Sequence, residues 1–144
     1  MATGTRVDPY KGFNFIVEID GITQAGFQEA SGLDSSTGSI DYREGTDPNH
    51  VRKLTGLNTF TAISLKSGVT DSDELWKWRQ TAVEGKAQRR NGSIVLLDDA
   101  GAEKIRWNFL NGWPSKWTGP SFNATSAAVA IESLEITHEE LKRA

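Results

Sequence analysis

Phe13-Asn-Phe-Ile-Val-Glu-Ile-Asp20 is the segment that decides the fold class, because it carries the clearest strand signal in the chain. Its odd-numbered residues are all apolar, and Asn14, Glu18 and Asp20 occupy three of the four even-numbered positions. A strand places alternate side chains on opposite faces, so a period of two predicts a strand with one fully apolar face. We therefore expect a chain built mainly from β-strands.

Three further strands are expected before the middle of the chain. Gly21 supplies a turn, after which Ile22 to Ala30 is expected to return beside the first strand and to end at Ser31-Gly32. Alternation over residues 39–44 predicts a third strand, and Phe60 to Ser67 predicts a fourth.

A long polar connection separates the third and fourth expected strands. Residues 45–57 show no periodicity, whereas compact domains usually join strands with about 2–6 residues. Such a loop is either disordered or contacts another molecule. Val51, Leu54 and Leu57 are spaced along it as apolar anchors, and this favours a contact loop.

One helix is expected between Gly68 and Gly85. Residues 70–74 offer hydroxyl and carboxylate caps, including Asp71 and Glu74 at capping-box spacing. Apolar residues follow helical spacing and form a stripe along this helix. The stripe should pack on the chain's own sheet and leave Lys77 and Gln80 outward. It consists of Leu75, Trp78 and Ala82, with Trp76 and Val83 one step round. An aromatic binding box is the functional alternative for these tryptophans.

The C-terminal part predicts a hairpin followed by an irregular segment and a last strand. Residues 93–98 and 104–110 should pair through the turn at 98–101, and the Gly- and Pro-rich residues 111–120 are not expected to form a regular element. In the last strand, residues 127–137, the apolar positions change from odd to even. This change predicts a bulge near Glu132-Ser133, or else a strand covered on both faces, the second by a neighbouring subunit.

These segments predict a mainly β (α+β) fold, an antiparallel β-sandwich or barrel of about seven strands with one packed helix. The 144 residues suit a single domain, 1–144, in which residues 1–12 are expected to form an extended N-terminal arm. There is no cysteine, which excludes disulfides and thiolate chemistry. The N-terminus lacks the apolar core of a signal peptide, so we expect synthesis in the cytoplasm without secretion by that route.

Charge and residue inventory argue against nucleic-acid binding and against catalysis. Sixteen Lys and Arg oppose 19 Asp and Glu, a formal charge of −3, which is too balanced for a protein whose main partner is a phosphate backbone. Carboxylate pairs occur only at an expected helix cap, a turn tip and the C-terminus, where a perturbed pKa is unusual. A metal site from Asp47, Asn49 and His50 is conceivable, but the same residues are typical of a turn. We expect no catalytic, cofactor or metal site, and no enzyme.

The chain also resembles a known family along most of its length. The matching runs are Asp8 to Gly21, Ala25 to Leu33, Tyr42 to Gly45, Arg52 to Leu54, Gly56-Leu57, Leu75 to Trp78, Arg89 to Gly92 and Trp113 to Trp117. They resemble the tail-tube proteins of contractile phage tails and of phage-tail-like contractile injection systems. Thr55 and Ser67 depart from the proline and the basic residue expected there, which affects loop stiffness and local charge rather than the assignment.

The resemblance implies a subunit of homohexameric rings, similar in fold to the type VI secretion tube protein. The rings would stack into a hollow inner tube, with a contractile sheath, a baseplate and terminal cap proteins as partners. Cargo or DNA would pass through the lumen, and the assembled particle would be a phage tail or an injection device.

Two sets of residues are expected to serve this assembly. Contacts between subunits are expected at Arg43, Glu44, Asp47, Val51, Arg52, Lys53, Leu54 and Leu57, a mixture of apolar and charged groups typical of interfaces. The lumen is expected to be lined by polar strand residues, with Asn14, Glu18, Ser39, Asp41 and Thr61 as candidates.

A monomeric β-sandwich that binds a ligand is the alternative function. Trp113 and Trp117 would then form a stacking platform, for example for carbohydrate, although packing under the Gly- and Pro-rich segment also accounts for them. A hydrolase is a more distant alternative. The particle size of the purified protein separates a tube subunit from a monomeric module.

Overall fold

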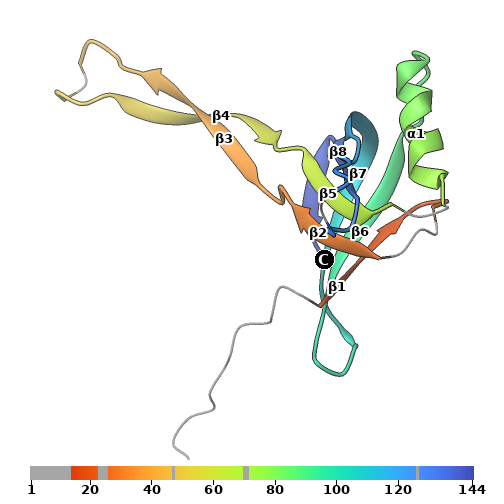
Figure 1. Cartoon of the computed structure of the whole chain (residues 1–144). Helices are drawn as coiled ribbons and strands as arrows, with labels where there is room; N and C mark the ends of the chain where they lie inside the picture. The colour runs from red at the N-terminus through yellow and green to blue at the C-terminus, as the bar shows by residue number, and fades with distance from the viewer. Residues whose placement is uncertain (1–13, 23–25, 47, 70–71, 126) are drawn as a thin grey trace, which may run out of the picture.

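The computed structural model describes residues 14–22, 26–46, 48–69, 72–125 and 127–144. Within these residues the chain forms nine strands and one helix (Figure 1). The strands are β1 (Phe15–Ile19), β2 (Phe27–Ser31), β3 (Ser35–Tyr42), β4 (Arg52–Phe60), β5 (Ile63–Gly68), β6 (Arg90–Leu97), β7 (Glu103–Thr118), β8 (Ile131–Thr137) and β9 (Glu140–Arg143). The helix is α1 (Glu74–Val83). The expected arm at residues 1–12 lies outside the described residues.

The described strands form one seven-stranded sheet and a separate two-stranded ribbon, all antiparallel. The large sheet has the order β1-β6-β7-β8-β5-β2, with β9 also paired to β7, and β3 pairs with β4 alone. A mainly antiparallel β fold with one helix is therefore confirmed, with more strands than the sequence indicated.

The partner of β1 differs from the expected one. Its alternation is as predicted, but it pairs with β6, with Phe15 opposite Leu96 and Ile19 opposite Gly92. The segment after Gly21 makes only an isolated bridge, between Ile19 and Ile22. The strand that follows is shorter than expected and pairs with β5. Gly21 has a positive φ, so the turn is correct, but the two strands it separates do not form a hairpin.

Strand β7 runs through the Gly- and Pro-rich segment, contrary to the expectation that this segment is irregular. Its first part pairs with β6 as far as Gly112, and its second part, from Trp113, pairs with β8. At the change of partner Asn111 has φ 54°, a left-handed conformation that asparagine tolerates better than most residues. Pro114, which lacks an amide donor, lies at a register shift in the ladder. A single strand thus joins the two halves of the sheet.

The core lies between these two halves and the helix. It contains Ile19 and Ile94 from one half, paired residues of β5 and β8 from the other, and Leu75 and Trp78 from α1. Phe109 of β7 is fully buried at its centre. A Cβ at Gly92 or Gly112 would meet the Phe109 ring at 2.5 Å or 2.7 Å, so these glycines make room for the ring.

The helix packs on the sheet as predicted. Leu75 and Trp78 are buried, Trp78 donates its Nε1 hydrogen to the Gln88 carbonyl (2.7 Å), and Arg79 donates to the Pro114 carbonyl (3.3 Å). Trp76, by contrast, is exposed. Within the described part of the chain, no helix has the length and apolar content needed to cross a membrane.

The C-terminal end of the helix agrees with the prediction, whereas the N-terminal cap differs from it. Gly85 has φ 80° just beyond the C-terminal cap at Glu84, in agreement with the expected stop. Asp73 occupies the N-cap position without a side-chain capping bond, and its carboxylate instead pairs with Lys77 (3.3 Å). The expected cap residues Thr70 and Asp71 lie outside the described residues. Val83 is exposed and Gln80 is partly buried, both contrary to the expected stripe.

The last long strand begins later than expected and contains no bulge at Glu132-Ser133. Its register with β5 is continuous from Ile131 opposite Gly68 to Ile136 opposite Ile63. Val129 precedes the strand and is 70% exposed, so it does not belong to the buried face. The apparent change of phase therefore marks the start of the strand. The register shift in this region is in β7, at Pro114.

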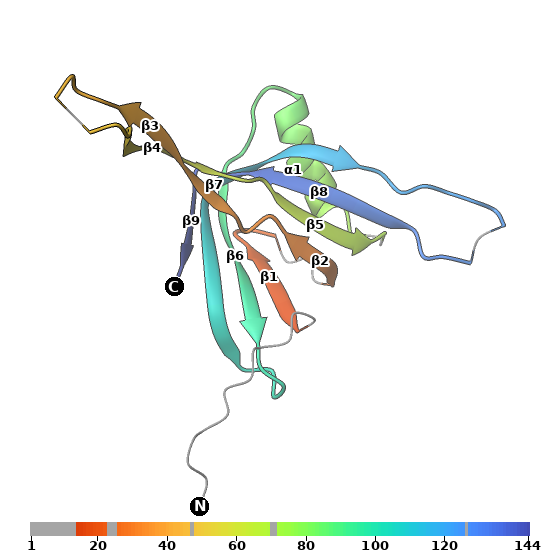
Figure 2. The same cartoon turned by 90° about the vertical axis from the view of Figure 1, so that its left-hand side faces the viewer.

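The β3–β4 hairpin stands away from the body of the molecule (Figures 1 and 2). The expected loop over residues 45–57 is wrong in its C-terminal half, because residues 52–57 belong to β4 and pair with β3. The connection between the strands covers residues 43–51. We call residues 35–60 the hairpin arm.

Candidate functional site

The hairpin arm has two chemically different faces near its tip. Register places Ile40 opposite Leu54 and Tyr42 opposite Arg52, so these four side chains share one face. Ile40, Leu54 and Tyr42 are 55%, 47% and 41% exposed, and we call these three residues the apolar arm face. The other face carries polar residues in the same alternation, namely Ser39, Asp41, Lys53 and Thr55.

Bonds within the arm are polar and solvent-exposed. Asp41 forms an ion pair with Lys53, and Thr37 donates its hydroxyl hydrogen to Asn58 Oδ1 (2.7 Å). Tyr42 donates its hydroxyl hydrogen to Glu44 (2.5 Å), and this bond raises the tyrosine pKa. Exposed pairs of this kind contribute only about 0–1 kcal/mol each, and an isolated two-stranded hairpin is marginally stable in water. The arm therefore gains little stability from its own side chains.

The base of the arm is firmly attached to the body. Gly32 has φ 88°, and a Cβ there would lie 2.2 Å from the Ala62 carbonyl oxygen. His138 is buried, with its Nε2 atom 3.0 Å from the Thr61 carbonyl oxygen and its Nδ1 atom 3.2 Å from the Glu140 carbonyl oxygen. Its ring also lies 5.7 Å from that of Phe60. These contacts fix the point at which the chain leaves the body.

A second polar surface covers the outer face of β1, β6 and β7. Arg106 forms ion pairs with Glu18 (2.7 Å) and with Glu103, and both carboxylates raise the arginine pKa. Beside them Ser93 donates its hydroxyl hydrogen to Asn108 Oδ1 (2.6 Å). This outer face is therefore mainly hydrophilic, with the exposed Ile16 among its polar groups and its central charges compensated in pairs.

The structure separates the five lumen candidates into three places. Glu18 lies on the outer face of β1, and Asn14, just before that strand, donates to the Asp98 carbonyl (2.5 Å). Ser39 and Asp41 lie on the polar face of the hairpin arm. Thr61 lies at its base. Of the expected contact residues, Arg43, Glu44 and Val51 lie in the connection, and Arg52, Lys53, Leu54 and Leu57 lie in β4. Asp47 lies outside the described residues.

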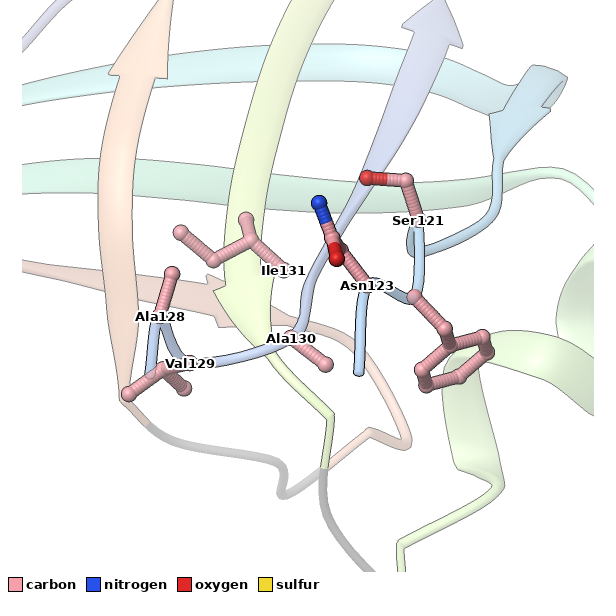
Figure 3. Close-up of a pocket in the computed structure, with 7 residues that line it drawn as sticks. Ser121, Asn123, Ala128, Val129, Ala130 and Ile131 are labelled. Carbon is pink, nitrogen blue, oxygen red and sulfur yellow. The ribbon is translucent and has the colours of Figure 1, made fainter. Parts of the chain in front are cut away.

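Sequence reasoning missed an apolar surface on the segment between β7 and β8. Phe122 and Val129 are 83% and 70% exposed, and with Ile131 they line a cavity of about 440 Å³ (Figure 3). Val69, also exposed, donates its backbone hydrogen to the Ala130 carbonyl (3.0 Å) beside them. We call Val69, Phe122, Val129 and Ile131 the Phe122 patch. The available signal was Phe122 itself, an isolated aromatic residue in a polar segment.

The aromatic stacking platform considered from the sequence does not form, and Asp47 of the conceivable metal site lies outside the described residues. Trp113 and Trp117 lie within β7 and are partly buried, and Trp117 packs against the core and against Trp76 (5.3 Å between ring centroids). They do not present an open stacking platform. Among the described residues no three His, Asp or Glu side chains gather as metal ligands.

The comparisons with known proteins point to one kind of assembly. The profile of the T4-like virus tail tube protein gp19 family matches residues 11–142. No curated protein sequence matched the chain directly.

Several solved structures superpose on most of the chain. In the cryo-EM structure of the PVC sheath/tube terminator in the extended state, from an extracellular contractile injection system, a chain is 30% identical, with TM-score 0.87 and coverage of 97% of this chain and 99% of that chain. A chain of the anti-feeding prophage tube terminating cap is 28% identical, with TM-score 0.88 and coverage of 99% of this chain and 95% of that chain. A chain of the extended PVC sheath-tube complex is 29% identical, with TM-score 0.84 and coverage of 94% of this chain and 91% of that chain. Hcp1 from Flavobacterium johnsoniae shares the fold at 17% identity, with TM-score 0.58 and coverage of 91% and 94%.

Proposed function

The chain belongs to the T4-like virus tail tube protein gp19 family and is a structural subunit of a tube; we propose that its copies form homohexameric rings that stack into a rigid inner tube. The tube would serve a contractile injection particle or a contractile phage tail. In this role the chain carries out no catalysis and requires no cofactor.

The hairpin arm is the observation that carries the assembly proposal. Its apolar face is exposed in the subunit, and the arm stands beyond the reach of the chain's own core (Figure 2). A surface that alternates apolar and charged residues is suited to an interface with another protein. We assign the contact to a neighbouring subunit and include Arg43, Glu44, Val51, Arg52, Lys53 and Leu57 among the contact residues, with Asp47 as a further member of this set.

Strand edges in the described residues support closure into a ring. β1 and β2 end the large sheet, so each pairs along one edge only. Unpaired edges promote uncontrolled association, and closing sheets from several subunits into a barrel removes them. A hexamer that joins such edges would leave the hydrophilic outer face of β1, β6 and β7 available to line the lumen.

Lumen lining by polar residues is part of the same proposal. Glu18 lies on that hydrophilic face and pairs with Arg106, and Asn14 lies beside the face, where it donates to the Asp98 carbonyl. Paired charges and amides would let a load slide, whereas an apolar wall would bind unfolded cargo. Ser39 and Asp41 on the arm and Thr61 at its base remain candidates. Cargo or DNA is the proposed load.

Partners are proposed from the assemblies that the similar structures come from. Those structures are described as a sheath-tube complex, a baseplate and a tube terminating cap. We propose that this chain is likewise enclosed by a contractile sheath and meets a baseplate at one end and a cap at the other. It would be made in the cytoplasm and assembled into a particle that acts outside the cell.

Deleting the hairpin arm tests the assembly role. Thr37 lies directly opposite Asn58, so an Asn-Gly turn can replace residues 38–57 and still close a short hairpin. The body should fold, because its core lies in β1, β5–β8 and α1, and negative-stain images should show no tubes. Substituting Ser39 and Thr55 by alanine on the polar face is the matched control and should leave tubes intact.

Two results would argue against the proposal. Long tubes from the arm-deleted chain would place the assembly energy elsewhere. A parent chain that stays a 15.8 kDa monomer at high concentration would favour the ligand-binding module.

A further inference from the structure

His138 is a buried, ionisable side chain that belongs to none of the proposed assembly surfaces. It is 7% exposed and lies in the short connection between β8 and β9. Its Nε2 atom is 3.0 Å from the Thr61 carbonyl oxygen, and its Nδ1 atom is 3.2 Å from the Glu140 carbonyl oxygen. Thr61 lies between β4 and β5 at the base of the hairpin arm, and Glu140 begins β9. The ring therefore spans the space between the arm base and β9.

Both polar contacts of the ring are with groups that only accept hydrogen bonds. A backbone carbonyl oxygen has no hydrogen to donate, so each ring nitrogen must be the donor in its own bond. A neutral imidazole carries hydrogen on one nitrogen only, whereas the imidazolium carries hydrogen on both. In the neutral ring, one nitrogen turns a lone pair toward a carbonyl oxygen, and that contact is repulsive. Only the protonated ring can bind Thr61 and Glu140 together.

The surroundings of the ring can accommodate a positive charge. A buried cation is costly unless polar groups compensate it, and here two carbonyl oxygens lie beside the two ring nitrogens. The ring centroids of Phe60 and Phe109 lie 5.7 Å and 6.1 Å from that of His138. Aromatic rings attract cations at centroid distances up to about 6 Å. The protonated form is therefore supported from several sides.

The charged side chains next to the histidine are engaged with other partners. Glu139, in the same connection, pairs with Arg89 (3.1 Å), and Glu140 of β9 pairs with Lys142 (3.0 Å). The arm base and β7 meet the ring with a backbone carbonyl and two phenylalanine rings. Within the described part of the chain, no carboxylate forms an ion pair with the ring. The number of ring hydrogens therefore decides whether both contacts hold.

We propose that His138 is a proton-dependent bridge, in which the protonated ring ties the base of the hairpin arm to β9 and the loss of one proton breaks this tie. Histidine ordinarily changes charge between about pH 5 and pH 8, so the bridge is closed at the acidic end of this range and open at the alkaline end. The bridge is a property of the single subunit. Its effect on assembly rests on the proposed tube function, because a loosened arm base must be ordered again when tubes form.

Nitrogen-15 NMR of the full chain, labelled only at histidine, tests the bridge directly. The chain contains two histidines, and the His50→Gln variant identifies the signals of His138. Buried, hydrogen-bonded N–H groups exchange slowly with water, so we expect two ring N–H signals from His138 at about pH 5.5 and one at about pH 8. One signal at both pH values would show that the second contact is not a hydrogen bond. Two signals at both values would show that the ring does not switch, and either result overturns the inference.

Tube assembly provides the second measurement, in which each protein is compared with itself at two pH values. The ratio of the protein concentrations needed for tubes at about pH 8 and about pH 5.5 should be roughly two- to tenfold larger for the parent than for His138→Gln, because one hydrogen bond contributes about that factor. His50 is exposed in the connection between β3 and β4, so His50→Gln is the matched control and should keep the parent's ratio.

The two measurements separate failure of the inference from failure of the proposed function. Equal ratios for the parent and His138→Gln, in tubes that form normally, would contradict the effect of the bridge on assembly. If the parent forms no tubes at either pH, the proposed function fails, and the NMR signals of the subunit alone decide whether the bridge exists.

Discussion

Replacing Trp78 by alanine should destabilise the free subunit strongly, because this side chain attaches the helix to the sheet. Trp78 is 2% exposed, belongs to the core cluster, and donates a hydrogen bond to the Gln88 carbonyl (2.7 Å). Truncating a buried tryptophan costs about 3–5 kcal/mol, and the lost hydrogen bond adds about 0.5–1.5 kcal/mol. A domain of this size has a total stability of about 7–20 kcal/mol.

We therefore expect the free energy of unfolding to fall by about 4–6 kcal/mol and Tm to fall by roughly 10–20 °C. Urea and thermal unfolding, followed by circular dichroism at concentrations where light scattering reports single subunits, measure both quantities. The slope of the urea transition should stay unchanged if the variant keeps the native fold.

Trp76 in the same helix provides the matched control. It is 48% exposed and its main contact is the edge-to-face pair with Trp117, so Trp76→Ala should cost only about 1 kcal/mol. Equal losses for the two variants, or a Trp78→Ala subunit that melts within a few degrees of the parent, would refute the assignment of the buried helix face.

Two pH-dependent effects follow from particular carboxyl groups. Asp98 accepts backbone hydrogen bonds from Ala102 and Ala100 (2.9 Å each), and these bonds, the Ala102 bond most of all, lower the pKa of its carboxyl group. The stability that Asp98 contributes is therefore present at neutral pH and is lost as the pH falls through its folded pKa. Asp98→Ala should therefore destabilise the subunit at pH 7 and have a smaller effect in acid, measured by urea unfolding at several pH values; an equal effect at every pH would contradict this. Burial raises the pKa of Glu132, so its ionised form destabilises the fold as the pH rises above the ordinary glutamate range. Glu132→Gln should stabilise the subunit slightly at pH 7 and not below the ordinary glutamate pKa, and a destabilised variant at pH 7 would show that the ionised group is favourably paired.

Local signals in the sequence were sufficient for several elements. The alternation in β1, the buried pair Leu75 and Trp78 of the α1 stripe, and the turn at residues 98–101 each depend on residues close together in the chain, and the structure contains all three. In that turn the Gly101 amide donates to the Asp98 carbonyl (3.0 Å). Short-range patterns predict such elements because the physical cause is itself short-range.

Which strands pair with each other was harder to predict from the sequence. Phe15 pairs with Leu96 across most of the chain, and alternation states only that a strand has an apolar face, not which strand lies beside it. The arm was missed for a different reason. β4 buries none of its residues from Arg52 to Leu57 in the subunit, so its sequence carries no buried face and resembles a loop. A strand that buries neither face in the subunit has no core pattern to recognise.

Strand β7 shows how tertiary context overrides local preference. Gly112 and Pro114 are poor strand residues, but Gly112 leaves space beside Phe109 and Pro114 falls where the ladder shifts register. The candidate functional surfaces also differ in whether they depend on local sequence or on tertiary contacts. The hydrophilic alternation of β1 was readable, whereas the Phe122 patch depends on how residues 69 and 121–131 meet in space.

The distance along the chain between β1 and β6 also governs how the subunit must fold. β1 is synthesised well before the strand that pairs with it, and β5 similarly waits for β8. Folding is slow when pairing is dominated by contacts distant in sequence, and an unpaired apolar strand is then open to aggregation. Among the described strands, β3–β4, β6–β7 and β7–β8 are pairs of consecutive strands that can form early from neighbouring residues. Synthesis rate and chaperone supply, more than final stability, should therefore limit how many subunits a cell delivers for assembly.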